Sequence, residues 1–135
     1  MAERKNMLDA SKRKIVAVGK VRYLPYERDG VKVPGMSWAP LSVDAELGRR
    51  GRLLLRMEPG CEGPVHRHGD YDEFFMIEGS LVDSDGTKVT AGDYVVFEPG
   101  TIHYTDSPEG CVILVTYMAN NELLVSESLE EVSST

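Results

Sequence analysis

The three histidines of the chain are the residues whose types and spacing suggest chemistry. His66 and His68 lie two positions apart on an expected strand, so their side chains point to the same face of a sheet. Asp72 and Glu73 follow across a tight turn, and His103 begins a later strand. Imidazoles that converge with one carboxylate form a site for a divalent first-row metal ion. The alternative is that each histidine is an ordinary surface or core residue.

Short strands separated by turn signals must position these side chains. Turns recur roughly every 8–12 residues, and Asp85-Gly86 is a strong hairpin signal because its turn needs φ > 0. Two short strands at 15–18 and 21–24 and a surface loop at 41–52 come first. The pattern predicts an all-β antiparallel sandwich or small barrel. The later strands are expected at 53–57, 64–68, 73–77, 81–83, 87–89, 94–97 and 111–117.

Two motifs resemble those of the cupin superfamily. The first runs Gly60-x5-His66-x-His68-x3-Asp72-x6-Gly79, and the second, GDYVVFEPGTIH, ends at His103. Trp38-Ala39-Pro40 and Gly110-Cys111 further resemble the ChrR-type anti-sigma-factor cupin domain and small cupin dioxygenases. The resemblance implies a jelly-roll barrel (a double-stranded β-helix) over residues 15–125. An N-terminal segment, 1–14, is expected to be poorly ordered, and residues 126–135 form an acidic tail.

The resemblance implies one divalent metal ion per chain, held by the three histidines and an acid. The usual acid of the family is Glu. Counting back from Gly79 puts Asp72 in its place, whereas counting forward from His68 puts Glu73 there. Because side chains alternate along a strand, only one of the two acids readily faces the metal. We expect Asp72, with Glu73 as the alternate. The donor set suits Fe, Zn, Mn, Ni or Cu, and Fe(II) is favoured by the likeness to cupin dioxygenases.

Three classes of function fit these features. The first is a non-haem Fe(II)-type dioxygenase acting on a small diketone or hydroxylated aromatic substrate, with no catalytic residue assigned beyond the metal ligands. The second is a metal-binding sensor or ligand-binding module that resembles the ChrR-type domain, and the third is a sugar isomerase or epimerase. An oxygenase needs an accessible, mostly apolar cavity above the metal. We expect its lining to include some of Phe74, Met76, Ile102, Ile113 and Tyr117.

The composition of the chain indicates which partners to exclude and which compartment to expect. Lys and Arg number 15 and Asp and Glu 22, which gives a net charge of −7. An acidic surface repels phosphates, so we expect neither nucleic acid nor a membrane as partner. No apolar run approaches the ~20 residues that cross a bilayer, and no signal segment is evident. The two cysteines, Cys61 and Cys111, fit a reducing cytoplasm and are expected to be small buried side chains.

The edges of such a barrel predict an assembly. Exposed strand edges are commonly covered by pairing between subunits. We therefore expect a homodimer, with residues 15–24 as candidates for strand exchange.

Overall fold

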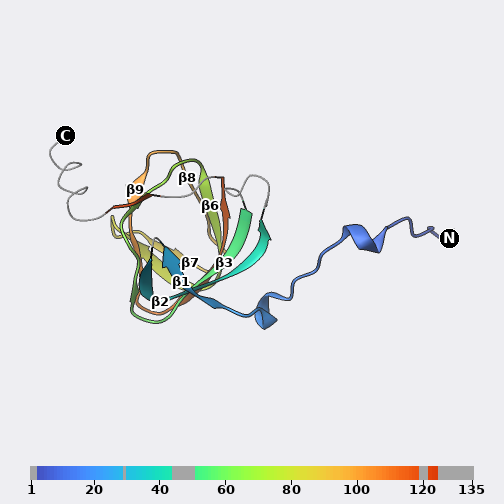
Figure 1. Cartoon of the computed structure of the whole chain (residues 1–135), viewed down its shortest axis with the longest axis horizontal. Helices are drawn as coiled ribbons and strands as arrows, with labels where there is room; N and C mark the ends of the chain where they lie inside the picture. The colour runs from blue at the N-terminus through green and yellow to red at the C-terminus, as the bar shows by residue number, and fades with distance from the viewer. Residues whose placement is uncertain (1–2, 29, 44–50, 119–121, 125–135) are drawn as a thin grey trace.

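The computed structural model describes residues 3–28, 30–43, 51–118 and 122–124. These residues form a barrel of β-strands with an N-terminal segment that leads away from it (Figure 1). Within them, no helix is long and apolar enough to cross a membrane. The elements are η1 (Ala10–Lys12), η2 (Val18–Lys20), β1 (Leu24–Arg28), β2 (Val31–Val43), β3 (Gly51–Met57), β4 (Cys61–Glu62), β5 (His66–Arg67), β6 (Asp72–Asp83), β7 (Lys88–Thr90), β8 (Tyr94–Phe97), β9 (Ile102–His103), β10 (Thr105–Ser107), β11 (Cys111–Tyr117) and β12 (Glu122–Leu123).

Antiparallel pairing organises the strands into two sheets. The larger has the order β1-β2-β3-β11-β6-β10-β4, and β7 and β8 also pair with β6. The smaller has the order β12-β5-β9. The first part of β6, residues 72–79, pairs with β11 and β8, whereas its last part, residues 80–83, pairs with β7 and β10. This arrangement confirms the expected all-β jelly-roll barrel.

The long strand β6 turns the corner of the barrel at Gly79. This glycine has φ +79°, and a Cβ built on it would lie 2.1 Å from the carbonyl oxygen of Gly110. Just beyond it, the hydroxyl of Ser107 donates to the carbonyl of Ser80 at 2.6 Å. Only glycine fits a backbone that combines a positive φ with so close an approach. The corner is therefore fixed by one residue type.

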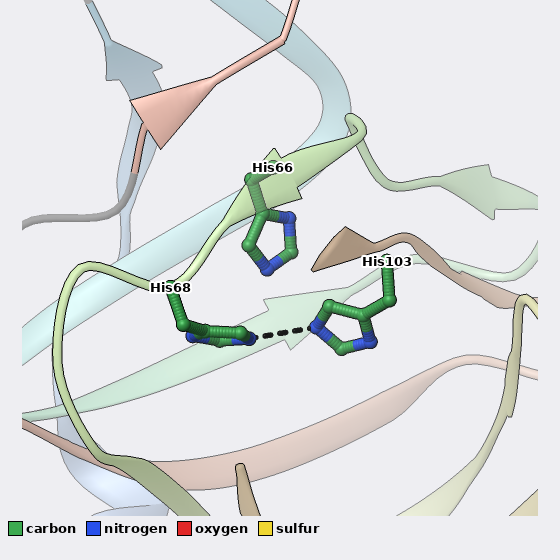
Figure 2. A group of neighbouring side chains, drawn as sticks. All are labelled: His66, His68 and His103. Atoms are coloured by element: carbon green, nitrogen blue, oxygen red, sulfur yellow. Dashed lines mark hydrogen bonds between the residues drawn. The ribbon is translucent and has the colours of Figure 1, made fainter. Parts of the chain in front are cut away.

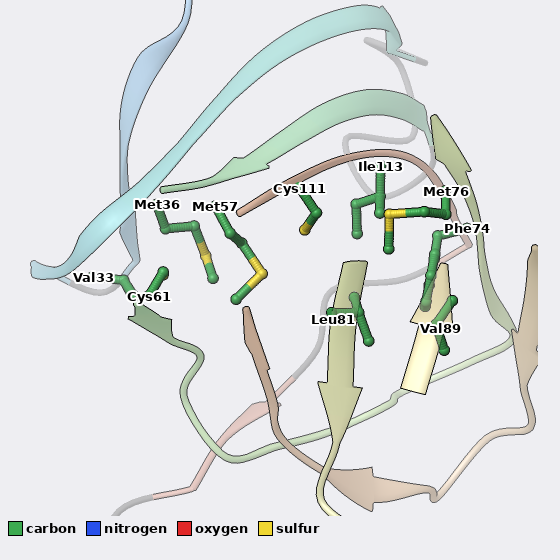
Figure 3. Packing of buried hydrophobic residues seen from close by; sticks show 10 residues of the cluster. All are labelled: Val33, Met36, Met57, Cys61, Phe74, Met76, Leu81, Val89, Cys111 and Ile113. Atoms are coloured by element: carbon green, nitrogen blue, oxygen red, sulfur yellow. The ribbon is translucent and has the colours of Figure 1, made fainter. Parts of the chain in front are cut away.

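The apolar faces of the strands form the core inside the barrel. Met76 has no exposed surface, and the other members are almost as deeply buried (Figure 3). Cys61 and Cys111 belong to this cluster and are free thiols, as expected for small buried side chains. Burial raises the pKa of both thiols. The cluster comprises Val33, Met36, Met57, Cys61, Phe74, Met76, Leu81, Val89, Cys111 and Ile113.

Two sequence-based expectations about local structure are wrong. Residues 15–18 and 21–23 are not strands, because a 3-10 turn forms at Val18–Lys20 and β1 begins only at Leu24. The surface loop expected at 41–52 is shorter, because β2 continues through residue 43 and β3 begins at Gly51. Residues 44–50 lie outside the described residues, as does the acidic tail 126–135.

The hairpin expected at Asp85-Gly86 is confirmed. The end of β6 pairs with β7, and Gly86 has φ +89°. The amide of Gly86 donates to the carbonyl of Asp83 at 2.8 Å, which closes the turn. The turn therefore holds Asp83 at the end of β6.

Candidate metal centre

The two short strands β5 and β9 bring the histidines together. His66 and His103 are directly opposite each other in this antiparallel pair. His68 lies one residue beyond β5, where its amide donates to Thr101 and its carbonyl accepts from Gly100. The backbone ladder therefore continues as far as His68. As a result, three imidazoles from two distant parts of the sequence lie close together inside the barrel.

One ring nitrogen from each histidine points toward the same place. The Nε2 atoms of His68 and His103 are 2.9 Å apart, and the ring of His66 points into the space beside them (Figure 2). One nitrogen from each ring lies within 4.8 Å of the others. His68 and His103 are 3% and 7% exposed, and His66 is half-buried. Burial and the neighbouring imidazoles lower the pKa of His66 to about 4, so the ring is neutral at pH 7.

The outward nitrogens of all three rings face oxygen atoms. Nδ1 of His66 lies 2.9 Å from the carbonyl oxygen of Pro64, and Nδ1 of His103 lies 3.0 Å from Oδ1 of Asp83. Nδ1 of His68 lies 3.3 Å from Oδ2 of Asp72. An imidazole that donates its Nδ1 proton to an oxygen keeps a lone pair on Nε2. The Nδ1 contacts of His66 and His103 match those of metal-binding histidines, whose second nitrogen is usually held in this way, so the cluster could hold a metal ion.

The separation of two of the ring nitrogens suits a divalent cation. Two nitrogen ligands with bonds of about 2.1 Å at a right angle lie about 3.0 Å apart. This separation is close to the 2.9 Å between the Nε2 atoms of His68 and His103. In the described residues, Nδ1 of His68 is a buried nitrogen without a hydrogen bond, although Oδ2 of Asp72 lies 3.3 Å from it. A cation on the opposite nitrogen of this ring would strengthen that contact, since it polarises the N–H group.

The structure separates the two acids at the start of β6. Asp72 is 6% exposed and lines the barrel interior, whereas Glu73 lies on the outer face and accepts a hydrogen bond from the hydroxyl of Tyr94. The alternation of side chains along β6 explains this difference. Oδ2 of Asp72 lies 3.3 Å from the outward nitrogen of His68, and its role as the acid ligand stays a prediction. Within the described residues, the group of converging ligand atoms contains the three histidines alone.

Sequence reasoning missed two residues that touch the histidines. The sequence pattern places Asp83 next to a hairpin turn, yet its carboxylate holds His103. The same pattern makes Phe97 an ordinary strand residue, yet its ring stacks on that of His68. The centroid of the Phe97 ring lies 5.0 Å from that of His68 and 4.3 Å from that of His103. Neither contact has a sequence signal, because each depends on how the barrel curls.

A cavity of about 510 Å³ opens beside the histidines. Of the five side chains expected in its wall, Phe74, Ile113 and Tyr117 line it. Met76 and Ile102 are not among the described residues that line the cavity. Met76 is fully buried in the core, and Ile102 neighbours His103 on β9, so its side chain points to the opposite face.

Most other lining side chains of the cavity are apolar. The wall includes Trp38, which the sequence did not assign to it, and the charged residues Glu27 and Arg28 of β1 also line the cavity. These further lining residues include Tyr26, Glu27, Arg28, Met36, Trp38, Leu53, Leu55, Leu81, Phe97, Thr105, Val115 and Leu123.

Solved structures share this fold at low sequence identity. An acetylacetone dioxygenase from Acinetobacter johnsonii superposes with a TM-score of 0.72 at 16% identity, covering 95% of this chain and 87% of that one. The polyketide cyclase RemF from Streptomyces resistomycificus gives 0.67 at 20% identity, covering 91% and 94%. The complex of Rhodobacter sphaeroides SigE with the anti-sigma ChrR gives 0.61 at 19% identity, with 76% of this chain and 51% of that one covered.

The sequence itself matches one family over most of its length. No curated protein matches the chain. The family described as the ChrR Cupin-like domain matches residues 11–121, which include both strands that carry the histidines. The barrel, the cupin neighbours and this match agree with the resemblance carried by the two histidine motifs. The chain belongs to the ChrR Cupin-like domain family of cupins.

Proposed function

We propose that this chain is a metal-dependent oxygenase, a non-haem Fe(II)-type dioxygenase that acts on a small diketone or hydroxylated aromatic compound. The observation that carries the proposal is the convergence of three imidazoles on a cavity of about 510 Å³. This volume lies in the usual range of small-molecule sites. Three protein ligands leave coordination positions open for substrate and O2. Acetylacetone, in the name of one structural neighbour, is a β-diketone.

The protein residues around the histidines have separable roles in this proposal. Fe(II) held by His66, His68 and His103 would supply the redox chemistry that joins O2 to an organic substrate. Asp83 holds the proton on Nδ1 of His103, which keeps Nε2 available as a ligand. Asp72 holds His68 from the same outward side, and we assign it to positioning that ring.

The walls of the cavity favour an apolar substrate with few polar groups. Phe97 covers the rings of His68 and His103, and the centroid of the Phe74 ring lies 6.2 Å from that of Phe97. The two aromatic rings therefore exclude water from the side of the histidines that they cover. Hydroxyl groups on the lining come from Thr105 and the tyrosines, which suits orientation of one or two substrate oxygens. A sugar, with a hydroxyl on nearly every carbon, fits this lining poorly, which disfavours the isomerase alternative.

Metal analysis followed by oxygen uptake tests the proposal. Protein purified without added metal is analysed for its elements, then stripped and reloaded with Fe(II) or Zn(II). Oxygen consumption is followed against a panel of β-diketones and hydroxylated aromatics. We expect consumption with the iron form and at least one compound, and none with the zinc form or with His66→Ala. An iron form that is loaded to one equivalent and inert across the panel contradicts the proposal.

A metal-binding sensor or ligand-binding module is the second candidate. The match to the ChrR Cupin-like domain family supports it, because the ChrR neighbour is an anti-sigma factor in complex with its partner. This function requires no turnover of substrate. Tight zinc at one equivalent in the purified protein, together with an inert iron form, favours this candidate.

A further inference from the structure

Arg28 brings a positive charge to the cavity beside the histidines. Among the described residues that line this cavity, it is the only lysine or arginine. An arginine side chain keeps its charge at any physiological pH, and its planar guanidinium matches a carboxylate through two parallel hydrogen bonds. The mostly apolar lining therefore contains one group that is suited to an anion.

The hairpin of β1 and β2 places Arg28 at the cavity. In the order of the described strands, β1 lies at the edge of the larger sheet (Figure 1), and Arg28 pairs with Val31 at the tip of the hairpin. The pairing of β2 with β3 begins only at Met36, so the tip extends past β3. Tyr26 and Arg28 are half-buried, whereas Glu27 between them is exposed. Because Tyr26 packs against the core, the side chain of Arg28 faces the same interior side.

No acidic residue in the described ranges forms an ion pair with Arg28. The ion pairs of this part of the chain involve other side chains. Glu27 also lines the cavity, but it is exposed and lies directly opposite Lys32 in the ladder, so a second cation offsets its charge. Charged groups that are partly removed from water usually have a partner of opposite charge. An anion that enters the cavity would be that partner for Arg28.

We propose that the substrate of this cavity carries a carboxylate, which the guanidinium of Arg28 binds. The inference rests on the proposed oxygenase function and names its substrate class, a β-diketone or a hydroxylated aromatic compound that is also a carboxylic acid. The keto or hydroxyl oxygens face the histidine cluster, the carbon skeleton contacts the apolar wall, and Arg28 holds the carboxylate. The net charge of −7 repels anions at long range, so a preference for a carboxylate requires a local cation such as Arg28.

Pairs of probes that differ by one carboxylate test the inference. Catechol is compared with protocatechuate, which is catechol bearing a carboxylate, and acetylacetone with acetopyruvate, in which a carboxylate replaces one methyl group. Isothermal titration calorimetry measures the dissociation constants on the zinc-loaded full-length chain, which binds the probes without a redox reaction. We expect the acid of at least one pair to bind about tenfold or more tightly than its neutral partner, because a hydrogen bond between two charged groups is a strong one.

Two matched variants assign this preference to one residue. Arg28→Gln should bind the two members of a pair equally, and its unchanged affinity for the neutral probe shows that the cavity is intact. Arg22→Gln removes the same charge from an exposed residue outside the described lining and should keep the preference. The rigid ring of protocatechuate keeps its carboxylate away from a metal ion that holds both hydroxyl oxygens, so that metal ion cannot act in place of Arg28.

The outcomes separate this inference from the proposed function. Equal binding of acid and neutral probe in both pairs, or a preference that Arg28→Gln retains, overturns the role of Arg28. Neither result depends on O2. Oxygen uptake by the iron form without a carboxylate preference overturns this inference alone, whereas a preference that Arg28→Gln abolishes, with an inert iron form, supports it and contradicts the oxygenase alone.

Discussion

Asp72 and Asp83 are the first and last residues of the same strand, yet both of their carboxylates contact imidazoles of one site. Oδ2 of Asp72 lies 3.3 Å from Nδ1 of His68, and Oδ1 of Asp83 lies 3.0 Å from Nδ1 of His103. A straight strand of twelve residues would separate its ends by about 36 Å. The two ends meet the same histidine cluster because β6 curls around the barrel, so the corner at Gly79 helps to set the positions of both rings.

Replacing Gly79 with Ala should destabilise the barrel. The new Cβ would meet the carbonyl oxygen of Gly110 at 2.1 Å, and the positive φ adds strain. We expect a loss of more than about 1 kcal/mol in unfolding free energy, measured by urea denaturation. Gly86→Ala is the matched control, because Gly86 has φ +89° and a Cβ added there would meet nothing within 4 Å, so it isolates the backbone strain. Equal losses in the two variants would show that β6 moves to accommodate the methyl group.

Replacing Asp83 with Asn should weaken metal binding without unfolding the protein. The amide keeps the shape of the side chain but removes the negative charge that stabilises the proton on Nδ1 of His103. Residues in this role typically contribute 10–100-fold to metal affinity. Competition with a chromophoric chelator measures the change. Asp85→Asn, an exposed residue of the same hairpin, is the control and should bind metal normally. Unchanged affinity in Asp83→Asn would contradict the positioning role.

The acids at the start of β6 should behave differently from each other and from a histidine ligand. His66→Ala should remove stoichiometric metal while the barrel stays folded, because the core forms from apolar side chains. Asp72→Ala should retain metal with affinity lowered about 10–100-fold, and Glu73→Ala should bind nearly as the wild type does. Elemental analysis and chelator competition give both values. Complete loss of metal in Asp72→Ala, as in His66→Ala, would show that Asp72 is itself a ligand.

The metal-free protein should lose stability as the pH falls from about 6.5 to 4. Burial lowers the pKa of His66 to about 4 in the folded state from its ordinary value of 6.5. Between these values the unfolded chain binds a proton that the folded chain resists, so acid favours unfolding. The contribution of this one group is about 3 kcal/mol at most. Urea unfolding of chelator-treated protein at several pH values measures the slope. His66→Asn should flatten it, and identical slopes in the two proteins would contradict this origin.

The sequence is sufficient to predict the barrel and the three histidines, but not the contacts that hold the rings. The alternating strands and the Asp85-Gly86 turn are local signals that can be recognised in the sequence. The pairing of β5 with β9 then places His66 opposite His103. The partnership of Asp83 with His103 joins residues 20 positions apart across a curled strand, which no local pattern encodes.

The same limit explains the expectations that differ from the structure. The apolar, alternating character of Val21 and Tyr23 favours a strand, but packing against the outside of the sheet satisfies that pattern equally well. For Met76, apolar character predicts an interior position without distinguishing the solid core from the cavity wall.

The passage of β6 around the corner from one face of the barrel to the other links the barrel into a single cooperative unit. The first part of the strand pairs with β11 and its last part pairs with β7, so displacing β6 from either face strains the continuous backbone that pairs with the other face. Amide protons on both halves of β6 should therefore exchange with solvent deuterium only through global unfolding, at one shared protection free energy. The histidine cluster, whose two carboxylate contacts lie at the ends of this strand, inherits that rigidity.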